Sequence, residues 1–384
     1  MKIVIAPDSF KETLSASEAA NAIEAGFLEF FPSAEIHKSP IADGGEGTVD
    51  VLVSATEGSY FSTNVLGPMG EAVSARWGML GDTKTAVIEV AEACGLHLVS
   101  VEKRNPMIAS SYGVGELILA AVDEGAEHII IGLGGSSNND GGMGFLRAIG
   151  VRFQDISGNQ LRGDVSSLSS LSDIDLSYID PRLKGVSFEV ACDVDNPLVG
   201  PQGASAIFAS QKGADSQMID QLDIILNHYS GVISRKFNND VSLYPGAGAA
   251  GGIGYGFKAF LDAELKSGIK IILDKVDFNH HLLNADLVIT GEGKIDSQSD
   301  RGKAPIGVIE YAKRHKCRIF IIAGTIENSD TLISNYGIDK VFSVVSSELS
   351  IEEAMANPFE SLMAISREAA QHYKKYYSDF NSQD

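Results

Sequence analysis

Short apolar runs rich in β-branched residues, each followed by a helical pattern, occur at both ends of the chain and constrain its fold more than any other feature. Lys2–Ala6 is such a run at the start, and Arg318–Ala323 and Lys340–Val345 are two more near the end. Runs of this kind are typical of buried parallel strands that are joined by helices. The two chain ends therefore predict an open α/β sheet.

The first predicted helix has a clear start signal. Ser15 is a favourable N-cap residue, and Glu18 three residues later completes a capping box. The residues that follow place an apolar face on the helix: Ala19, Ile23 and Phe27. A second strand at about 36–41 leads into a glycine-rich turn and a helix at about 47–55. This β-α-β-α order is typical of the beginning of an open α/β sheet.

The middle of the chain follows a different pattern. Between Tyr60 and Ala91, short alternating stretches are separated by glycine and proline, which predicts an antiparallel meander. Further strands are expected at 128–133 and 187–192, and further helices at about 114–124 and 218–235.

At 384 residues the chain is too long for a single core, so we expect two α/β domains. A flavodoxin-like or Rossmann-like domain is predicted from residues 1–60 and 285–384, because both segments carry the strand-helix pattern. A second, mixed α/β domain, residues 61–284, is expected as an insertion in the first.

The composition excludes several classes of partner. The formal net charge is −21, and such an acidic surface repels nucleic-acid backbones and anionic membranes. A nucleotide substrate would therefore need local cations and backbone N–H groups. Cys94, Cys192 and Cys317 are widely spaced and predict neither a disulfide framework nor a zinc site. The apolar run at 3–7 is too short for a secretory signal or a membrane span, so we expect a cytoplasmic protein.

Two motifs rich in polar residues follow the first two predicted strands. Ligands of open α/β sheets bind at the carboxyl ends of the strands, so this position favours a site. The first motif, APDSFK, contributes Asp8, Ser9 and Lys11. The second, ADGGEGT, opens a helix whose first N–H groups favour anions, and contributes Asp43, Gly44 and Gly45. Turn formation and helix capping alone would also explain both motifs.

A third motif, GLGGSSNNDGG at 132–142, has five glycines in eleven residues. A structural loop needs one or two glycines, and the excess indicates close approach of the backbone to a ligand. We predict phosphate or substrate binding at Gly134, Gly135 and Ser136, and metal binding at Asp140.

A fourth motif, PGAGAAGG at 245–252, supports two interpretations. It satisfies G-x-G-x-x-G, and Ile269–Leu273 followed by Asp274 imitates the second strand and ribose-binding acid of a dinucleotide site. The short, mixed stretch Val241–Tyr244 is a poor first strand for that fold. The other interpretation is phosphate binding at Gly248 and Gly251.

A fifth motif, TGEGKID at 290–296, and the residues after it combine charges of both signs. The carboxylates are Glu292 and Asp296, and the cations include Lys294 and Lys303. Phosphate requires cations and Mg²⁺ requires carboxylate oxygens, although a solvated cluster of salt bridges would have the same composition. In CDVDN at 192–196, Asp193 and Asn196 could bind metal, orient a substrate hydroxyl or cap a turn.

Together these motifs resemble, in order and over nearly the whole chain, those of the bacterial two-domain glycerate kinases, type I. The resemblance implies ATP-dependent phosphorylation of D-glycerate, with 2-phosphoglycerate as the favoured product. The residues that match the family's motifs by position are Asp8, Lys11, Asp43, Asp140, Asp193, Asn196, Glu292, Lys294, Asp296 and Lys303. Ser299 stands where threonine is expected, and keeps the hydroxyl. The Walker A and protein-kinase motifs are missing from the sequence.

Our hypothesis is that Mg-ATP and D-glycerate meet in a cleft between the two domains. Lys11, Lys294 and Lys303 are expected to contact phosphate or the substrate carboxylate, and Asp193 to accept the hydroxyl proton. Asp43, Glu292 and Asp296 are expected to coordinate Mg²⁺. Two alternatives remain: an NAD-linked oxidoreductase that uses the loop Gly246–Gly251, and a non-catalytic sensor of a phosphorylated metabolite.

Overall fold

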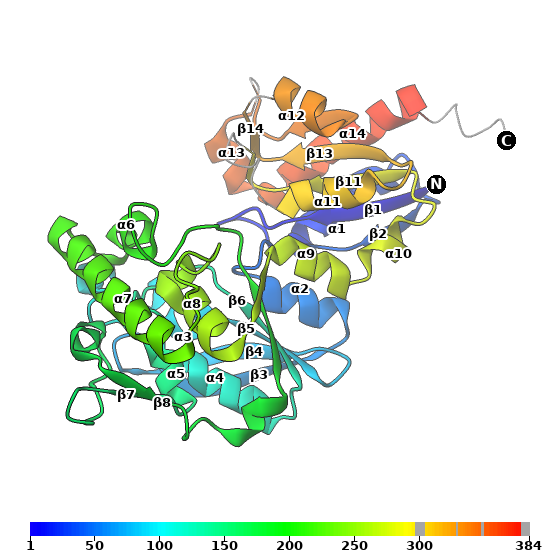
Figure 1. Cartoon of the computed structure of the whole chain (residues 1–384). Helices are drawn as coiled ribbons and strands as arrows, with labels where there is room; N and C mark the ends of the chain where they lie inside the picture. Colours follow the sequence, from blue (N-terminus) through cyan, green and yellow to red (C-terminus); the bar gives the residue numbers. More distant parts are fainter. Residues whose placement is uncertain (296–303, 328, 347–348, 378–384) are drawn as a thin grey trace. The chain divides into compact units, whose positions relative to one another are not determined.

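The computed structural model describes residues 1–295, 304–327, 329–346 and 349–377. These residues form two compact units (Figure 1). Unit 1 combines Met1–Asp43 with Ile269–Asp384, and unit 2 is Gly44–Gly268. The prediction of one α/β unit from both chain ends, with a second one inserted, is confirmed.

The sheet of unit 1 has five strands in the order β15-β13-β11-β1-β2. All of its neighbouring strands are parallel. The strands are β1 (Lys2–Pro7), β2 (Glu35–Lys38), β11 (Leu287–Gly291), β13 (Arg318–Ala323) and β15 (Lys340–Ser343). The helices are α1 (Ala16–Leu28), α9 (Gly268–Lys275), α10 (Phe278–Leu282), α11 (Ala304–Ala312), α12 (Ser329–Tyr336), α13 (Ile351–Ala356) and α14 (Pro358–Tyr377).

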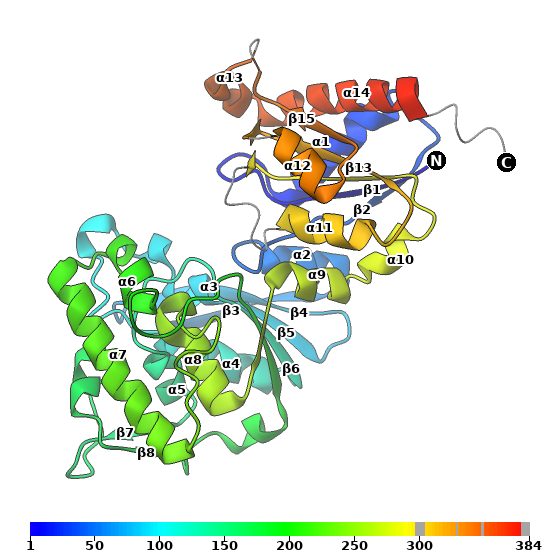
Figure 2. The same cartoon turned by 45° about the horizontal axis from the view of Figure 1, so that its top comes forward.

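The two faces of this sheet are covered by different helices (Figure 2). Helices α1 and α14 pack together on one face, where Ile23 and Phe27 join Ile5 and Ile289 in one apolar core. Helix α11 packs against β1 and β11 on the other face. The strands are buried on both faces because alternate side chains point to opposite sides, which explains their continuous apolar sequence. The capping box of Ser15 and Glu18 is present at the start of α1, as predicted.

The order of the strands in unit 1 reverses direction between β1 and β11. From β1 the chain moves to β2 on one side, and later returns to add β11, β13 and β15 on the other side. Helices that follow β1 and β11 therefore diverge, and their divergence leaves a crevice at the carboxyl ends of these two strands. Unit 1 thus has one position in its sheet that is favourable for a ligand.

Unit 2 contains a six-stranded mixed sheet in the order β10-β9-β6-β5-β4-β3. Its strands are β3 (Ser59–Leu66), β4 (Ala72–Met79), β5 (Thr85–Glu89), β6 (His128–Gly132), β9 (Ser187–Ala191) and β10 (Glu264–Lys266). The first three are antiparallel, which confirms the predicted meander, and the pairs from β5 to β10 are parallel. A separate antiparallel pair is formed by β7 (Arg152–Gln154) and β8 (Asp173–Asp175).

The helices and strands of unit 2 build one large apolar core, to which all of its helices except α2 contribute buried residues. The helices are α2 (Thr48–Ala55), α3 (Val90–Cys94), α4 (Tyr112–Asp123), α5 (Met143–Ala148), α6 (Ala204–Phe208), α7 (Ser216–Phe237) and α8 (Ala249–Leu261). Single 3₁₀ turns are formed by Leu96–Leu98, Val101–Lys103, Val165–Ser170, Pro181–Gly185 and Ser210–Lys212. Trp77, Phe145 and Phe257 are fully buried, and the last two rings stack with centroids 4.5 Å apart.

Two details differ from the sequence-based expectations. The chain passes between the units at 43/44 and 268/269 rather than at 60/61 and 284/285. The first boundary is earlier than expected because α2 packs against β4 and β5 of unit 2. Residues Ile269–Leu273, which imitate a Rossmann strand, form most of helix α9. A short apolar run does not by itself distinguish a buried helix from a strand. Here Ile269 packs against Gly307 of α11, and that contact favours the helix.

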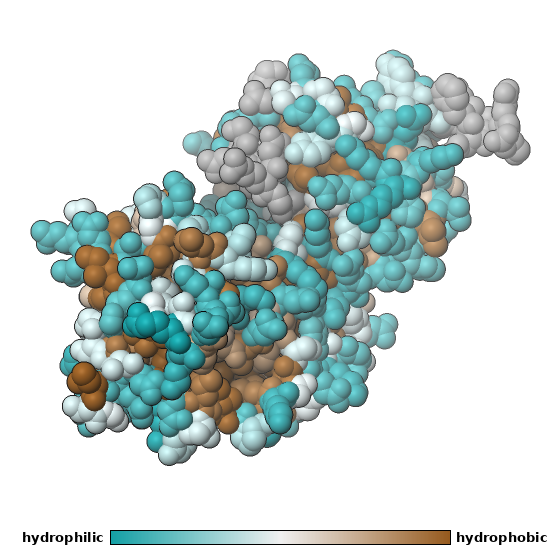
Figure 3. Space-filling view, in the orientation of Figure 1, coloured by the Kyte–Doolittle hydropathy of each residue, from teal (hydrophilic) through white to brown (hydrophobic). Residues whose placement is uncertain are grey.

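Hydrophilic residues cover most of the face shown in Figure 3, with apolar residues between them. Among the helices in the described ranges, none is both long enough and apolar enough to cross a membrane.

Candidate active site

The parallel pairing of β1 with β11 brings the first and fifth sequence motifs together. Pro7 and Gly291 are paired at the ends of these strands, and the Asp8 N–H donates to the Gly291 carbonyl at 2.8 Å. Asp8 and Glu292 are therefore the first residues beyond two neighbouring strands, at the reversal of strand order. Residues almost three hundred positions apart in the sequence form one end of the sheet.

The carboxyl group of Asp8 binds its proton more tightly than usual at this end of the sheet. Asp8 is buried, and burial, reinforced by the charge of Asp43, raises its pKa to about 7. Glu292 adds to the increase, while the Ser9 N–H, which donates to Asp8 Oδ1 at 2.6 Å, and Lys11 oppose it. Burial disfavours the ionised form of a carboxyl group, and nearby negative charges do the same. A cation bound beside these groups would relieve that repulsion.

Lysine side chains lie beside the same carboxylates. Lys11 is exposed in the turn after β1. Lys294 belongs to β12 (Lys294–Ile295), which pairs with β14 (Thr325–Ile326) and continues the pairing of β11 with β13 beyond the sheet. Its Nζ lies 3.1 Å from Glu327 Oε1, and both side chains are more than half exposed. Lys294 is thus positioned by the pairing of its backbone with β14, and its salt bridge to Glu327 is exposed.

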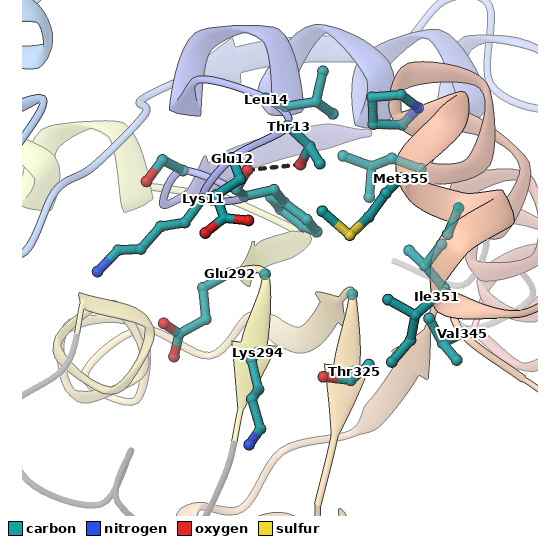
Figure 4. Close-up of a pocket in the computed structure, with 18 residues that line it drawn as sticks. Lys11, Glu12, Thr13, Leu14, Glu292, Lys294, Thr325, Val345, Ile351 and Met355 are labelled. Carbon is teal, nitrogen blue, oxygen red and sulfur yellow. Dashed lines mark hydrogen bonds between the residues drawn. The ribbon is translucent and has the colours of Figure 1, made fainter.

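Lys11, Glu292 and Lys294 are among the residues that line a cavity of about 550 Å³, which we call the strand-end cavity. The lining residues come from unit 1: Ser9, Phe10, Lys11, Glu12, Thr13, Leu14, Glu292, Gly293, Lys294, Gly324, Thr325, Val344, Val345, Ile351, Ala354, Met355, Pro358 and Leu362. Figure 4 shows the charged ends of Lys11, Glu292 and Lys294 on one side of it. Val345, Ile351 and Met355 lie on the other side.

The structure brings six of the predicted site residues into unit 1: Asp8, Ser9, Lys11, Asp43, Glu292 and Lys294. Asp296 and Lys303 lie outside the described residues. Within the described part of the chain, His, Cys, Asp and Glu side chains form no group of three or more that could hold a metal ion by itself.

The remaining predicted residues lie in unit 2, where Asp140 organises the glycine-rich loop. Asp140 is buried, and its Oδ2 accepts hydrogen bonds from the N–H and the hydroxyl of Ser111, both at 2.8 Å. Its Oδ1 accepts from Asn138 Nδ2 at 2.8 Å and from the Gly142 N–H at 3.1 Å. Oδ2 thus ties the loop to Ser111, the residue before α4, while Oδ1 bonds within the loop. This structural arrangement differs from the metal-binding role expected for Asp140.

The glycines of unit 2 allow loops to pack directly on one another. A Cβ on Gly134 would lie 2.8 Å from the Gly45 Cα, and one on Gly44 would lie 2.7 Å from the Ala191 Cβ. Gly248 and Gly251 pack in the same way: a Cβ on either would lie 2.2 Å from a backbone carbonyl oxygen, of Pro197 and Asn138 respectively. Gly251 also has a φ of +65°, and Gly135 one of +72°. At these glycines, the backbone closely approaches other segments of unit 2.

Sequence analysis missed a buried lysine behind this loop. Lys212 is 2% exposed, and its Nζ donates to Ser136 Oγ at 3.0 Å and to the Asn138 carbonyl at 2.6 Å. Burial lowers its pKa to about 8. The predicted residue Ser136 is therefore held by an ammonium group. Lys212 stands in an ordinary polar stretch, so no local pattern identifies it.

Other polar residues lie at the carboxyl ends of the parallel strands of unit 2. Asp193, after β9, is exposed, and its Oδ1 accepts from the Gly268 N–H at 3.1 Å. Asn196 uses its amide to donate to the Gln202 carbonyl at 2.8 Å. Glu89, which ends β5, was not identified from the sequence. It accepts from the Val49 N–H at 2.8 Å, and burial raises its pKa to about 7.

Comparison with known proteins gives one consistent result. Residues 3–374 match the glycerate kinase family. The chain is 51% identical to glycerate 2-kinase of Escherichia coli K12 over 96% of its length and 97% of that protein. It is 50% identical to glycerate kinase of Bacillus subtilis 168, over 97% and 98%. A crystal structure assigned as glycerate kinase 2 from Salmonella typhimurium LT2 superposes with a TM-score of 0.88 at 47% identity, covering 98% of each chain.

Proposed function

Because the chain belongs to the glycerate kinase family, we propose that it transfers the γ-phosphoryl group of ATP to D-glycerate, with 2-phosphoglycerate and ADP as products. The observation that carries this proposal is the match to the family over residues 3–374. The grouping of lysines and carboxylates at the ends of β1 and β11 supports it, because phosphoryl transfer needs both kinds of charge in one place.

In this proposal Lys11 and Lys294 bind the phosphates of ATP. The transferred group carries its charge on peripheral oxygens, so oriented ammonium groups stabilise the transition state without new covalent chemistry. The chain has 51 acidic residues against 30 Lys and Arg, which makes local cations the main source of attraction for an anionic substrate. Lys303 keeps the same role as a prediction from the sequence.

The carboxylates near these lysines fit a magnesium ion. Mg²⁺ is commonly held by one or two carboxylates together with substrate phosphates, so a complete protein cage is not required. Asp43 and Glu292 would hold it. Burial is the largest cause of the raised pKa of Asp8, and the charges of Asp43 and Glu292 add to it; a bound cation would offset that second contribution. When bound, Mg²⁺ neutralises charge on the β- and γ-phosphates. Asp296 remains a predicted third ligand.

Asp193 is proposed as the group that accepts the proton of the glycerate hydroxyl. One of its carboxylate oxygens is anchored by the Gly268 N–H, which would orient the side chain while it stays exposed to a substrate. General-base assistance by an oriented carboxylate typically contributes about 10²–10⁴-fold to the rate.

The NAD-linked alternative loses its support. The residues that would form its second strand form helix α9 instead. Asp274, the expected ribose-binding acid, accepts a hydrogen bond from the Tyr311 hydroxyl at 2.6 Å. The loop Gly246–Gly251 packs its glycines against other loops of unit 2.

The decisive experiment measures ADP release from Mg-ATP with D-glycerate as acceptor. L-glycerate, glycerol and a reaction without acceptor serve as controls, and ³¹P NMR locates the phosphate on the product. We expect release with D-glycerate alone and phosphate on the hydroxyl at C2. Phosphate on C3 would correct the product, and no release above the control without acceptor would reject the activity.

A further inference from the structure

The strand-end cavity has a polar half and an apolar half. In the proposed function, only the polar half has a ligand, the phosphates of ATP. Its polar half contains Lys11, Glu292 and Lys294. Its other half is formed by Val345 after β15 and by Ile351 and Met355 on α13 (Figure 4). Leu14, Val344, Ala354, Pro358 and Leu362 are further apolar residues that line the cavity.

The apolar half is accessible to a ligand. Ile351 is 53% exposed and Met355 is 45% exposed, although both lie beside a cavity rather than on an open convex surface. Apolar side chains left in contact with water in a concave site gain free energy when a ligand covers them. The capping box of Ser350 and Glu353 fixes the start of α13, so these side chains are presented from an ordered helix.

Glycerate cannot use such a surface. Each of its carbons carries oxygen, so it has no apolar group to bury, and a cavity of about 550 Å³ is large for so small an acid. A purine ring has two apolar faces, and in a nucleotide it is joined to the phosphates that lysines bind. The cavity also lies at the reversal of strand order, the position at which open α/β sheets bind nucleotides.

We infer that the strand-end cavity is the nucleotide subsite, with the purine ring against Val345, Ile351 and Met355 and the phosphates toward Lys11 and Lys294. This inference rests on the proposed function for the identity of the nucleotide. It assigns the selectivity for the base to α13 and to the residues after β15, a part of the chain in which the sequence motifs indicated no site.

The test separates the two halves with ligands that reach only one of them. Adenosine probes the apolar half, tripolyphosphate the cationic half, and ADP both, each measured by calorimetry on the full chain in EDTA. The main variant is Ile351→Ala with Met355→Ala. Leu283→Ala is the matched control, because Leu283 is a 50% exposed apolar residue of unit 1 that does not line the cavity.

We expect the double variant to bind adenosine and ADP about tenfold more weakly and tripolyphosphate as before. Lys294→Ala should show the reverse pattern, with weaker tripolyphosphate and ADP binding and unchanged adenosine binding. The Leu283 variant should bind all three like the unsubstituted chain. Unchanged adenosine and ADP binding in the double variant would overturn the inference, as would a rise in its KM for D-glycerate alone.

These measurements can reject the subsite and the proposed activity separately. If the chain binds ADP, and the double variant weakens that binding, but no phosphate reaches D-glycerate, then the subsite stands and the activity is wrong. If D-glycerate is phosphorylated normally by the double variant with an unchanged KM for ATP, then the activity stands and the subsite is wrong. Thermal melting of each variant identifies any loss of folding.

Discussion

The two units of this protein place similar residues at the ends of parallel strands and use them differently. In unit 1, charged residues after β1 and β11, together with Gly293 and Gly324, line a cavity. In unit 2, neighbouring loops occupy the space beside the glycines that follow β6 and precede α8. The ammonium group of Lys212 is buried against the loop after β6. Glycine content alone therefore does not distinguish a ligand site from tight loop packing.

Topology explains much of this difference. The parallel strands of unit 2 are added in one direction, from β5 through β6 and β9 to β10, so neighbouring connections do not diverge. In unit 1 the order reverses between β1 and β11, and the connections separate there. By topology, unit 1 is therefore the better location for a nucleotide.

The largest expected effect is on catalysis by unit 1. Lys294→Ala should lower kcat/KM for D-glycerate phosphorylation about 10³-fold, because an oriented cation that neutralises the transferred group is lost. Steady-state kinetics with varied ATP measures this effect. Lys340→Ala, at the opposite end of the sheet at the start of β15, is the matched control and should retain full activity. Near-normal kcat/KM for the Lys294 variant would remove this residue from the mechanism.

A smaller effect is expected from the proposed proton acceptor in unit 2. Asp193→Asn should lower kcat about 10²-fold and leave the KM for ATP unchanged, because the amide keeps the hydrogen bond from Gly268 but cannot accept a proton. Asp195→Asn, two residues away and also exposed, is the control. Equal kcat values for the two variants would contradict the role of Asp193.

The packing role of the unit 2 glycines predicts a loss of stability. Gly251→Ala should lower the free energy of unfolding by about 3 kcal/mol, because the methyl group would lie 2.2 Å from the Asn138 oxygen at a φ of +65°. Gly185→Ala meets no atom within 4 Å and should be near neutral. In unit 1, Gly293→Ala makes only an ordinary contact at 3.4 Å and should also be tolerated. Denaturant unfolding compares the three variants, and equal losses would contradict the comparison.

The smallest effect concerns the buried carboxyl group of unit 1. The pKa of Asp8 is raised from 3.8 to about 7, so the folded state holds its proton more tightly than the unfolded state. This contribution to stability is present below about pH 4 and is lost as the pH rises to about 7. Asp8→Asn should therefore stabilise the chain by about 2 kcal/mol at pH 8 and have little effect at low pH.

Thermal unfolding in EDTA over this pH range tests the last prediction, since EDTA removes cations that would stabilise the ionised carboxylate. Glu89→Gln gives the corresponding measurement for unit 2, where burial also raises the pKa of a carboxyl group to about 7. An Asp8 variant whose stability has the same pH dependence as the unsubstituted chain would show that this group titrates normally.

Local sequence was sufficient for much of the fold and for identifying the motifs that meet at the ends of β1 and β11. Strand β13 was predicted with its observed bounds, and the capping box that begins α1 follows from the spacing of Ser15 and Glu18. The motifs after β1 and β11 could be identified because polar residues follow buried apolar runs, a signal contained within a few residues. The family could be recognised for the same reason, since its motifs are short and ordered along the chain.

Tertiary structure decided what those motifs contact. It placed Asp8 beside Glu292, packed Gly251 against Asn138, buried Lys212 beneath the loop of Ser136, and made residues Ile269–Leu273 a helix. It also brought α13 to the strand-end cavity, where no motif indicated a site. Each of these results depends on pairing between residues far apart in the chain, and the energy of such pairing is not encoded in either segment alone.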